Sequence, residues 1–551
     1  MRKKIIITCL FVATSFFLIQ ENEACTNYLI TRGASVNGAT MISYAADSHT
    51  LYGELYYMPA RDYPVGSWLE IYEWDSGKYL GRIKQVPHTF SVVGNMNEYQ
   101  VAIGETTYGG RPELVDTTAI MDYGSLMYIA LQRAKTAREA IKIIADLMAE
   151  HGYCSSGESL SIADKDEVWI MEMIGKGPGN KGAVWVAQRI PDGYICAHAN
   201  QARITTFPQN DPENCLFAED VIDFAREKGW FSGKDKDFSF SDTYAPVDFH
   251  GARFCEARVW SFFSKVNSSM EKYLGYAMGH DLKNRMPLWI KPDRKISAQD
   301  MMTFMRDHFE GTPLDMTQDV GAGPYHLPYR WRPLTWEVDG HEYCNERAAA
   351  TQQTGFSFIT ESRNWLPDWI GGILWFGVDD AATTVYTPMY CGITKVPECY
   401  AVGNGDMLTY SPTSAFWTFN LVANFCYLRY DVMSKDVIQV QQYLENKFFL
   451  NKSAIDNAAV ELYQEDKEAA RNFLTDYSIS MGNYTFENWK RLSEYLLVKY
   501  IDGNIKKEAN GEFVRNGVSK NIPAMPLQTG YPEWWYEIIV EKTGDHLKVQ
   551  E

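Results

Sequence analysis

The beginning of the sequence limits the possible folds of this chain more than any other part of it. It has a basic start, an almost wholly apolar run over residues 5–19 and a polar stretch that ends on Ala24. This order is typical of a secretory signal peptide, which predicts that residues 1–24 are removed and that Cys25 becomes the first residue. The β-forming segment TNYLIT follows at once. We therefore expect Cys25 to lie at the edge or end of a sheet.

The predicted leader also sets the expected location of the protein. Its apolar run is too short to span a bilayer comfortably, and no later stretch has the length of a transmembrane helix. The sequence therefore predicts an exported protein, periplasmic or extracellular, with no integral membrane span. The alternative is a surface lipoprotein anchored through Cys25, although Asn22 and Glu23 are unlike the apolar and small residues usual in such signals.

Composition excludes several classes of partner. The net charge is -18 and the pI is about 5.1. Nucleic acids and anionic membranes bind proteins through clustered positive charge, and the sequence contains no run of Lys and Arg that would supply it. A hydrophobic content of 46% indicates a packed globular protein with an ample core.

The length of 551 residues predicts one large domain and a second body of structure, because a single core stops growing well below this size. We place the large domain at residues 25–410 and a mostly helical region at residues 411–551. A helix is predicted from Thr136 to His151, with Gly152 as its stop signal. Short strands are predicted at residues 26–31, 39–44, 90–93 and 99–104, the first two joined as a hairpin.

The clearest β-rich stretch runs from Glu167 to Asn200. It reads EVWIMEMI, the turn GKGPGNKG, AVWVAQRI, the turn PDG and YICAHAN. This order predicts a three-stranded meander. The glycine-rich turn lies between two strands and not before a helix, so a hairpin is favoured over a phosphate-binding loop.

The second half of the sequence mixes both kinds of element. Ser297 is predicted to cap a helix that runs through His308, and GFSFIT and GGILWFGVDD are predicted strands. Beyond Ser411 the pattern turns helical, in SAFWTFNLVANFCYLRY, DVIQVQQYLENKFFL, SAIDNAAVELYQEDKEAARNFLTDYS and TFENWKRLSEYLLVKYIDG. The predicted fold class is therefore α+β.

Cys25 is the main candidate for chemistry. An N-terminal cysteine carries its own base, because an α-amino group with a pKa near 8 lies beside a thiol with a pKa near 8.5. Proton transfer between them produces a thiolate that attacks carbonyl carbons. A structural first residue and a lipid-modified cysteine are the alternative interpretations.

Other kinds of chemistry have little support in the sequence. The ten His residues are isolated, and the cysteines lack the paired spacing of metal ligands, so we expect no metal and no cofactor. No G-x-S-x-G motif indicates a serine hydrolase. The scattered cysteines leave room for one disulfide, such as Cys391 with Cys399, but not for a disulfide framework.

The segment ACTNYLITRGASVNGATMISYAADS resembles the start of the cysteine dipeptidase family of N-terminal nucleophile (Ntn) hydrolases, which are related to penicillin V acylases and conjugated bile acid hydrolases. The resemblance implies a four-layer αββα fold over the catalytic domain, with a mostly helical C-terminal extension. It also implies that Cys25 is the nucleophile and that Asp47 holds and polarises its α-amino group. Many relatives have an arginine three residues before this Asp, where this chain has Tyr44, so a cation beside the thiolate is absent or comes from elsewhere.

Three further segments are similar to the family and imply site residues. NEYQVAIGETT places Thr107 at an oxyanion position, with Glu105 close by. AHANQARI matches an asparagine that donates to the oxyanion or the substrate, here Asn200. HGARFCEARVW resembles the segment that carries a charged arginine, which indicates Arg253.

The predicted activity is hydrolysis of amide bonds in dipeptides or short peptides, through a thioester on Cys25. Glu105 is a candidate partner for the ammonium group of such a substrate. An acylase acting on N-acyl amino acids or bile-acid conjugates is the alternative enzyme. A lipoprotein that binds peptides or glycans without turnover is the alternative outside enzymes. A homo-oligomer is possible.

Overall fold

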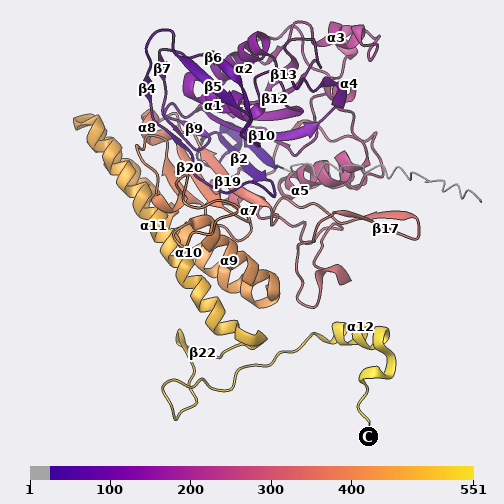
Figure 1. Cartoon of the computed structure of the whole chain (residues 1–551), viewed down its shortest axis with the longest axis vertical. Helices are drawn as coiled ribbons and strands as arrows, with labels where there is room; N and C mark the ends of the chain where they lie inside the picture. Colours follow the sequence, from indigo (N-terminus) through magenta and orange to yellow (C-terminus); the bar gives the residue numbers. More distant parts are fainter. Residues whose placement is uncertain (1–24, 551) are drawn as a thin grey trace, which may run out of the picture.

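The computed structural model describes residues 25–550, so the predicted signal peptide lies outside the described residues. Two large antiparallel sheets form the centre of the molecule, and helices cover their outer sides (Figure 1). The predicted α+β class is confirmed at this level. The sheets face each other, because β1 (Asn27–Ile30) and β2 (Met41–Asp47) in one lie against β10 (Ala102–Gly109) and β11 (Gly157–Ala163) in the other.

The first sheet has seven strands and begins its hydrogen bonding right behind Cys25. Leu29 pairs with Ile42 across the predicted hairpin. Its order is β16 (Trp289–Ile290), β14 (Ile195–His198), β1, β2, β19 (Thr354–Glu361), β20 (Ile373–Val378) and β21 (Thr387–Tyr390). The strands predicted from GFSFIT and GGILWFGVDD are therefore confirmed as β19 and β20.

The second sheet has eight strands and is covered on both faces. Along β12 (Val168–Gly175), Ile170 and Ile174 face one core cluster and Met171 and Met173 face another, as the two-residue period of a strand requires. This double burial explains why the segment is apolar throughout. The order is β15 (Cys215–Phe217), β13 (Ala183–Arg189), β12, β11, β10, β9 (Met96–Asn97), β8 (Val92–Val93) and β3 (Tyr57–Met58).

The predicted three-stranded meander is wrong in its third strand. β12 and β13 form the expected hairpin, but β14 pairs with β1 in the opposite sheet. The connecting turn is bound to that sheet, because Gly33 N donates to Asp192 Oδ1 at 2.6 Å and Thr31 Oγ1 donates to Tyr194 O at 2.7 Å. A Cβ atom on Gly33 would lie 2.8 Å from Gly193 N, so the close approach requires a glycine. Strand order along the sequence could not reveal this crossing.

Helices pack on the outer face of each sheet. α1 (Tyr123–Arg133) and the predicted α2 (Ala137–His151) lie on the eight-stranded sheet, and α2 is capped by Thr136 and ends at Gly152 as expected. On the seven-stranded sheet lie α5 (Ala257–Val266), α7 (Ala298–Met305), α9 (Ala415–Leu428), α10 (Tyr430–Glu465) and α11 (Lys467–Tyr500). The C-terminal helical segments are thus longer and fewer than predicted.

The remaining elements are short. They are β4 (Arg61–Asp62), β5 (Trp68–Tyr72), β6 (Tyr79–Lys84), β7 (His88–Thr89), α3 (Val221–Glu227), α4 (Phe240–Tyr244), α6 (Leu274–Ala277), β17 (Thr335–Val338), β18 (His341–Cys344), α8 (Asp368–Gly371), β22 (Glu508–Ala509), β23 (Glu512–Phe513) and α12 (Glu533–Thr543). Of the helices between residues 25 and 550, none combines the length and the apolar composition needed to cross a membrane.

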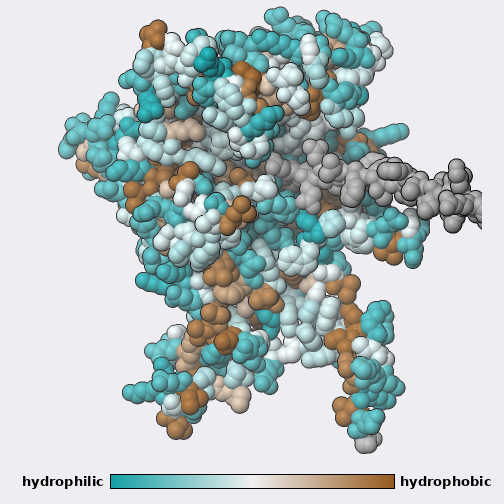
Figure 2. Space-filling model, viewed as in Figure 1, coloured by the Kyte–Doolittle hydropathy of each residue, from teal (hydrophilic) through white to brown (hydrophobic). Residues whose placement is uncertain are grey.

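The C-terminal arm, residues 501–550, extends away from the body (Figure 1) and contributes no buried residue. Figure 2 shows apolar side chains at the surface of this region, where Met525 and Val540 are exposed. The disulfide considered between Cys391 and Cys399 is not formed. The thiol of Cys391 donates instead to Asp368 O at 3.1 Å.

Candidate active site

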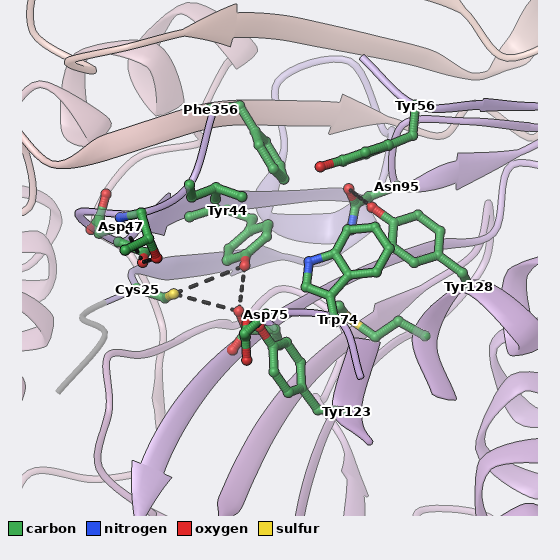
Figure 3. Close-up of a pocket in the computed structure, with 16 residues that line it drawn as sticks. Cys25, Tyr44, Asp47, Tyr56, Trp74, Asp75, Asn95, Tyr123, Tyr128 and Phe356 are labelled. Atoms are coloured by element: carbon green, nitrogen blue, oxygen red, sulfur yellow. Dashed lines mark hydrogen bonds between the residues drawn. The ribbon is translucent and has the colours of Figure 1, made fainter. Parts of the chain in front are cut away.

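Cys25 lies directly before β1, and its thiol lines a cavity of about 240 Å³ (Figure 3). The residue is buried, with 4% of its surface exposed. Its Sγ donates to Glu105 Oε1 at 3.4 Å and lies 3.9 Å from the hydroxyl of Tyr44. The predicted position at the end of a sheet strand is therefore observed, with the sulfur facing a cavity.

Both sheets, helix α1 and separate loops supply the walls of this cavity. Figure 3 shows Cys25 and Asp47 at one end of the view and the rings of Trp74 and Tyr128 at the other. These two rings stack with centroids 4.6 Å apart. The lining residues are Cys25, Tyr44, Ala46, Asp47, Ser48, Thr50, Leu51, Tyr56, Trp74, Asp75, Asn95, Glu105, Tyr123, Met127, Tyr128 and Phe356.

Tyr44 and Glu105 form a hydrogen-bonded pair beside the thiol. The Tyr44 hydroxyl donates to Glu105 Oε1, the same oxygen that accepts from Cys25. Burial, followed by the charges of Cys25 and Glu105, raises the pKa of Tyr44 well above its usual value. Tyr44 therefore stays a neutral donor at physiological pH, and it supplies no cation in the place where relatives have arginine.

Asp47 ends β2 and lines the same cavity as Cys25. Its Oδ2 accepts from Arg347 Nη2 at 2.5 Å and its Oδ1 accepts from Thr354 Oγ1 at 2.6 Å. Burial raises the pKa of Asp47, and Arg347, then Thr354, act in the opposite direction. The carboxyl group is thus fixed by two partners from outside the predicted motif.

Thr107 and Asn200 lie together but do not line the cavity. The Thr107 hydroxyl donates to Glu158 Oε1 at 2.6 Å, and Asn200 Nδ2 donates to Thr107 O at 2.6 Å. Burial, followed by the charge of Glu105, raises the pKa of Glu158 well above its usual value. In this structure the hydroxyl of Thr107 is therefore directed at Glu158. Its predicted role, and that of Asn200, stay predictions.

An arginine does reach Cys25, and it is Arg258 on α5. Its Nη1 donates to the carbonyl oxygen of Cys25 and, at 2.8 Å, to Thr26 Oγ1, while Nη2 donates to Asn200 Oδ1 at 2.9 Å. Burial and the neighbouring Arg347 lower the pKa of Arg258 to about 10. The group therefore remains charged at neutral pH.

Arg253, the arginine indicated by the sequence, lies elsewhere. Its guanidinium binds Glu346, with Nε 2.8 Å from Oε2, and it does not line the cavity. It belongs to a π-helical segment, Gly251–Glu256, whereas Arg258 follows in regular α-helix. The wider π turn changes which residues of ARFCEAR face the sheet, and sequence spacing alone does not show such a turn.

Several residues at the site, in the cavity wall or bound to it, had no signal in the sequence. Asp75 and Trp74 come from the turn between β5 and β6, and Tyr123 begins α1. Arg347 lies in an irregular segment before β19. Each is brought to the site by long-range packing. Within residues 25–550, no three His, Cys, Asp or Glu side chains are grouped as ligands for a metal ion.

Comparison with known proteins agrees with this geometry. Residues 54–443, more than half of the chain, match Peptidase family C69, a family of cysteine peptidases. The chain belongs to peptidase family C69. The predicted family and the predicted enzyme class, a peptidase, are therefore confirmed.

Similar curated proteins carry related names. "Probable dipeptidase B" of Streptococcus pyogenes serotype M1 is 23% identical over 528 residues, which cover 92% of this C69 chain and 98% of the relative. "Probable dipeptidase" of Latilactobacillus sakei is 23% identical over 463 residues, which cover 80% of this chain and 89% of the relative. "Probable dipeptidase" of Salmonella dublin is 25% identical over 298 residues, which cover 52% of this chain and 60% of the relative. These names agree with the predicted enzyme.

Proposed function

We propose that this C69 peptidase hydrolyses dipeptides or short peptides outside the cytoplasm, with the Cys25 thiolate as nucleophile. The observation that carries the proposal is the position of Cys25 Sγ in a cavity of about 240 Å³, 3.4 Å from Glu105 Oε1. A cavity of this size suits a small ligand better than a long chain. The dipeptidase names of its relatives support the same substrate class.

The proposed reaction is a two-step acyl transfer. With residues 1–24 removed, the α-amine of Cys25 takes the thiol proton, and the thiolate forms a C–S bond to the scissile carbonyl carbon. The ammonium then protonates the leaving nitrogen as the C–N bond breaks. Water, deprotonated by the same amine, hydrolyses the thioester and restores the thiol. Each correctly aimed oxyanion donor contributes about 3 kcal/mol.

The residues around Cys25 have proposed supporting roles. Asp47 orients the α-amine, and Arg347 in turn holds the Asp47 carboxylate at 2.5 Å. Arg258 fixes the main chain of Cys25 and the side chain of Asn200 through their oxygens. The amide nitrogen of Asn200 carries two N–H donors; one binds Thr107 O at 2.6 Å, and the other is the proposed donor to the oxyanion. Arg258 leaves that nitrogen available, because it holds the other end of the same side chain.

The fold assignment and the location belong to the same proposal. Two facing sheets with helices outside support the four-layer αββα N-terminal nucleophile fold, in which the nucleophile begins a central strand. The basic and apolar residues 1–19 support export to the periplasm or the extracellular space. An active protein that retains its leader would contradict the free α-amine on which the proposed mechanism depends.

Substitution of Cys25 tests the nucleophile. Hydrolysis of a dipeptide such as Ala-Ala is measured with Cys25→Ala, Cys25→Ser and, as a matched control, Cys196→Ser, whose buried thiol donates to Leu288 O at 3.2 Å and does not line the cavity. We expect no turnover by Cys25→Ala, a small remainder in Cys25→Ser and nearly full turnover in the control. Circular dichroism checks folding. Full activity of Cys25→Ala overturns the proposal.

A further inference from the structure

We propose that Asp75 acts together with Glu105 to bind the free α-ammonium group of the substrate, and so restricts the enzyme to peptides with an unblocked amino terminus. This inference rests on the proposed function, because it concerns the substrate of the same cavity. It adds a specificity-determining residue from a part of the chain that carries no family motif.

The turn between β5 and β6 is held at the cavity by α1. Asp122, the N-cap of α1, accepts a hydrogen bond from Trp74 N at 3.1 Å. The next residue, Asp75, accepts from the Tyr123 hydroxyl at 2.7 Å. Two neighbouring residues of α1 therefore bind two neighbouring residues of the turn, which fixes the Asp75 carboxylate among the lining residues. Asp75 is exposed and so stays accessible from solvent.

Asp75 and Glu105 act on the same set of neighbours. The pKa of Tyr44 is raised by burial first, then by Cys25 and Glu105. Tyr123, the partner of Asp75, makes a smaller contribution in the same direction. The charges of Glu105 and Asp75 both raise the pKa of Glu158, after burial. Coulomb interactions of this kind fall with distance, so both carboxylates lie near the Glu158 side chain. Figure 3 shows Asp75 and Tyr123 on the side of the cavity that holds the thiol contacts.

The chemistry of a dipeptide requires a negative partner at this place. Its α-nitrogen is separated from the scissile carbonyl carbon by a single carbon, so during attack it lies next to Sγ. Glu105 Oε1 is 3.4 Å from that sulfur. Among the described residues that line the cavity, carboxylates and aromatic rings occur, but no Lys, Arg or His. An ammonium group matches both kinds of wall, through charge and through the faces of aromatic rings.

Bound ammonium also changes the field at the nucleophile. A carboxylate beside a thiolate is electrostatically unfavourable, and a cation placed between Glu105 and Asp75 offsets that repulsion. Binding of the correct substrate would then favour formation of the thiolate. An N-acylated peptide lacks this charge and would place a neutral amide beside the two carboxylates.

The inference is tested by binding to the Cys25→Ala protein, which separates recognition from turnover. Calorimetry compares Ala-Ala with N-acetyl-Ala-Ala. Adding Asp75→Asn should raise the Kd for Ala-Ala about 10- to 100-fold, the range for losing a charged hydrogen bond. The Kd for the acetylated peptide should stay unchanged. Asp75→Glu should restore part of the affinity. The control is Glu70→Gln, which removes one exposed carboxylate from the same hairpin, where it accepts from Tyr79 at 2.6 Å.

The outcomes separate the two proposals. Unchanged affinity for Ala-Ala in Asp75→Asn overturns the ammonium site, and so does an equal loss for both peptides, which would show that Asp75 only stabilises the turn. Turnover of Ala-Ala by the Cys25→Ala protein would instead overturn the nucleophile. This turnover would appear as free alanine in the calorimeter cell, and its detection does not depend on the comparison between Asp75 variants.

Discussion

The guanidinium group of Arg258 binds the main-chain carbonyl oxygen of Cys25, not its sulfur. The same group donates to Asn200 Oδ1 at 2.9 Å. The cation therefore fixes the backbone of Cys25 relative to Asn200, which follows the end of the neighbouring strand β14. Its expected contribution is alignment of Cys25 and Asn200, together with a positive field at the thiolate.

Arginine substitutions distinguish the arginine found at the site from the arginine indicated by the sequence. We expect Arg258→Lys to lower kcat for Ala-Ala at least 10-fold with little change in KM, because lysine cannot hold both oxygens. Arg253→Lys should change kcat by less than about 3-fold, since Arg253 pairs with Glu346. Steady-state kinetics with thermal melts checks both. The reverse ranking would return the catalytic role to Arg253.

Thr107 gives a second test of the oxyanion assignment. Its hydroxyl donates to Glu158 at 2.6 Å, so Thr107→Val should lower the free energy of unfolding by about 1–3 kcal/mol through loss of a buried hydrogen bond. We expect kcat to fall less than 10-fold. Urea unfolding and steady-state kinetics measure the two effects. A fall of 100-fold or more at unchanged stability would assign the hydroxyl to the oxyanion.

His198 makes stability depend on pH. It lies on β14 and joins the two sheets, with Nδ1 2.7 Å from Thr106 Oγ1 and Nε2 2.8 Å from Ser161 Oγ. Burial lowers the pKa of His198 to about 3. The folded state therefore resists protonation, and the associated stability is present above pH 6.5 and lost as the pH falls toward 3.

The expected size of this pH effect on stability follows from the lowered pKa of His198. Between pH 7 and pH 5 the group should remove about 2 kcal/mol of the free energy of unfolding, because the unfolded histidine takes up a proton that the folded one does not. Denaturant melts of the native protein and of His198→Gln over this interval measure it. An equally steep loss in the variant would show that other groups cause the dependence.

The C-terminal arm should be dispensable for folding, unlike the helices before it. Residues 501–550 contain no buried residue, so deletion of residues 505–550 should change the free energy of unfolding by less than about 1 kcal/mol. Deletion from residue 430 removes α10 and α11, including the buried Phe448 and Trp489, and should prevent folding. Thermal melts of the two truncated chains check this. A large loss in the shorter deletion would assign the arm a structural role.

Local patterns were sufficient for several elements of this fold. Helix α2, with Thr136 as its N-cap and Gly152 as its C-cap, and the capping box of Ser297 with Asp300 follow from residues close to one another in sequence. The place of β14 in the sheet could not be predicted in the same way, because its partner β1 lies more than 160 residues earlier in the sequence. Asn27, for example, pairs with His198. Strand pairing depends on packing between distant segments.

The site shows the same division. Cys25, Tyr44, Asp47 and Glu105 line one cavity, and all four were found from residues near the predicted leader or from a family motif. Arg258 was missed by five positions, because a π-helical turn precedes α5. Asp75 carries no motif, and only the docking of the β5–β6 turn on α1 brings it to the cavity.

N-terminal sequencing together with intact mass, on active enzyme recovered from its native host, tests the central claim most directly. We expect the active chain to start at Cys25, with no modification on its amine. Active protein that still contains residues 20–24, or that bears a lipid or acyl group on the amine of Cys25, would contradict it.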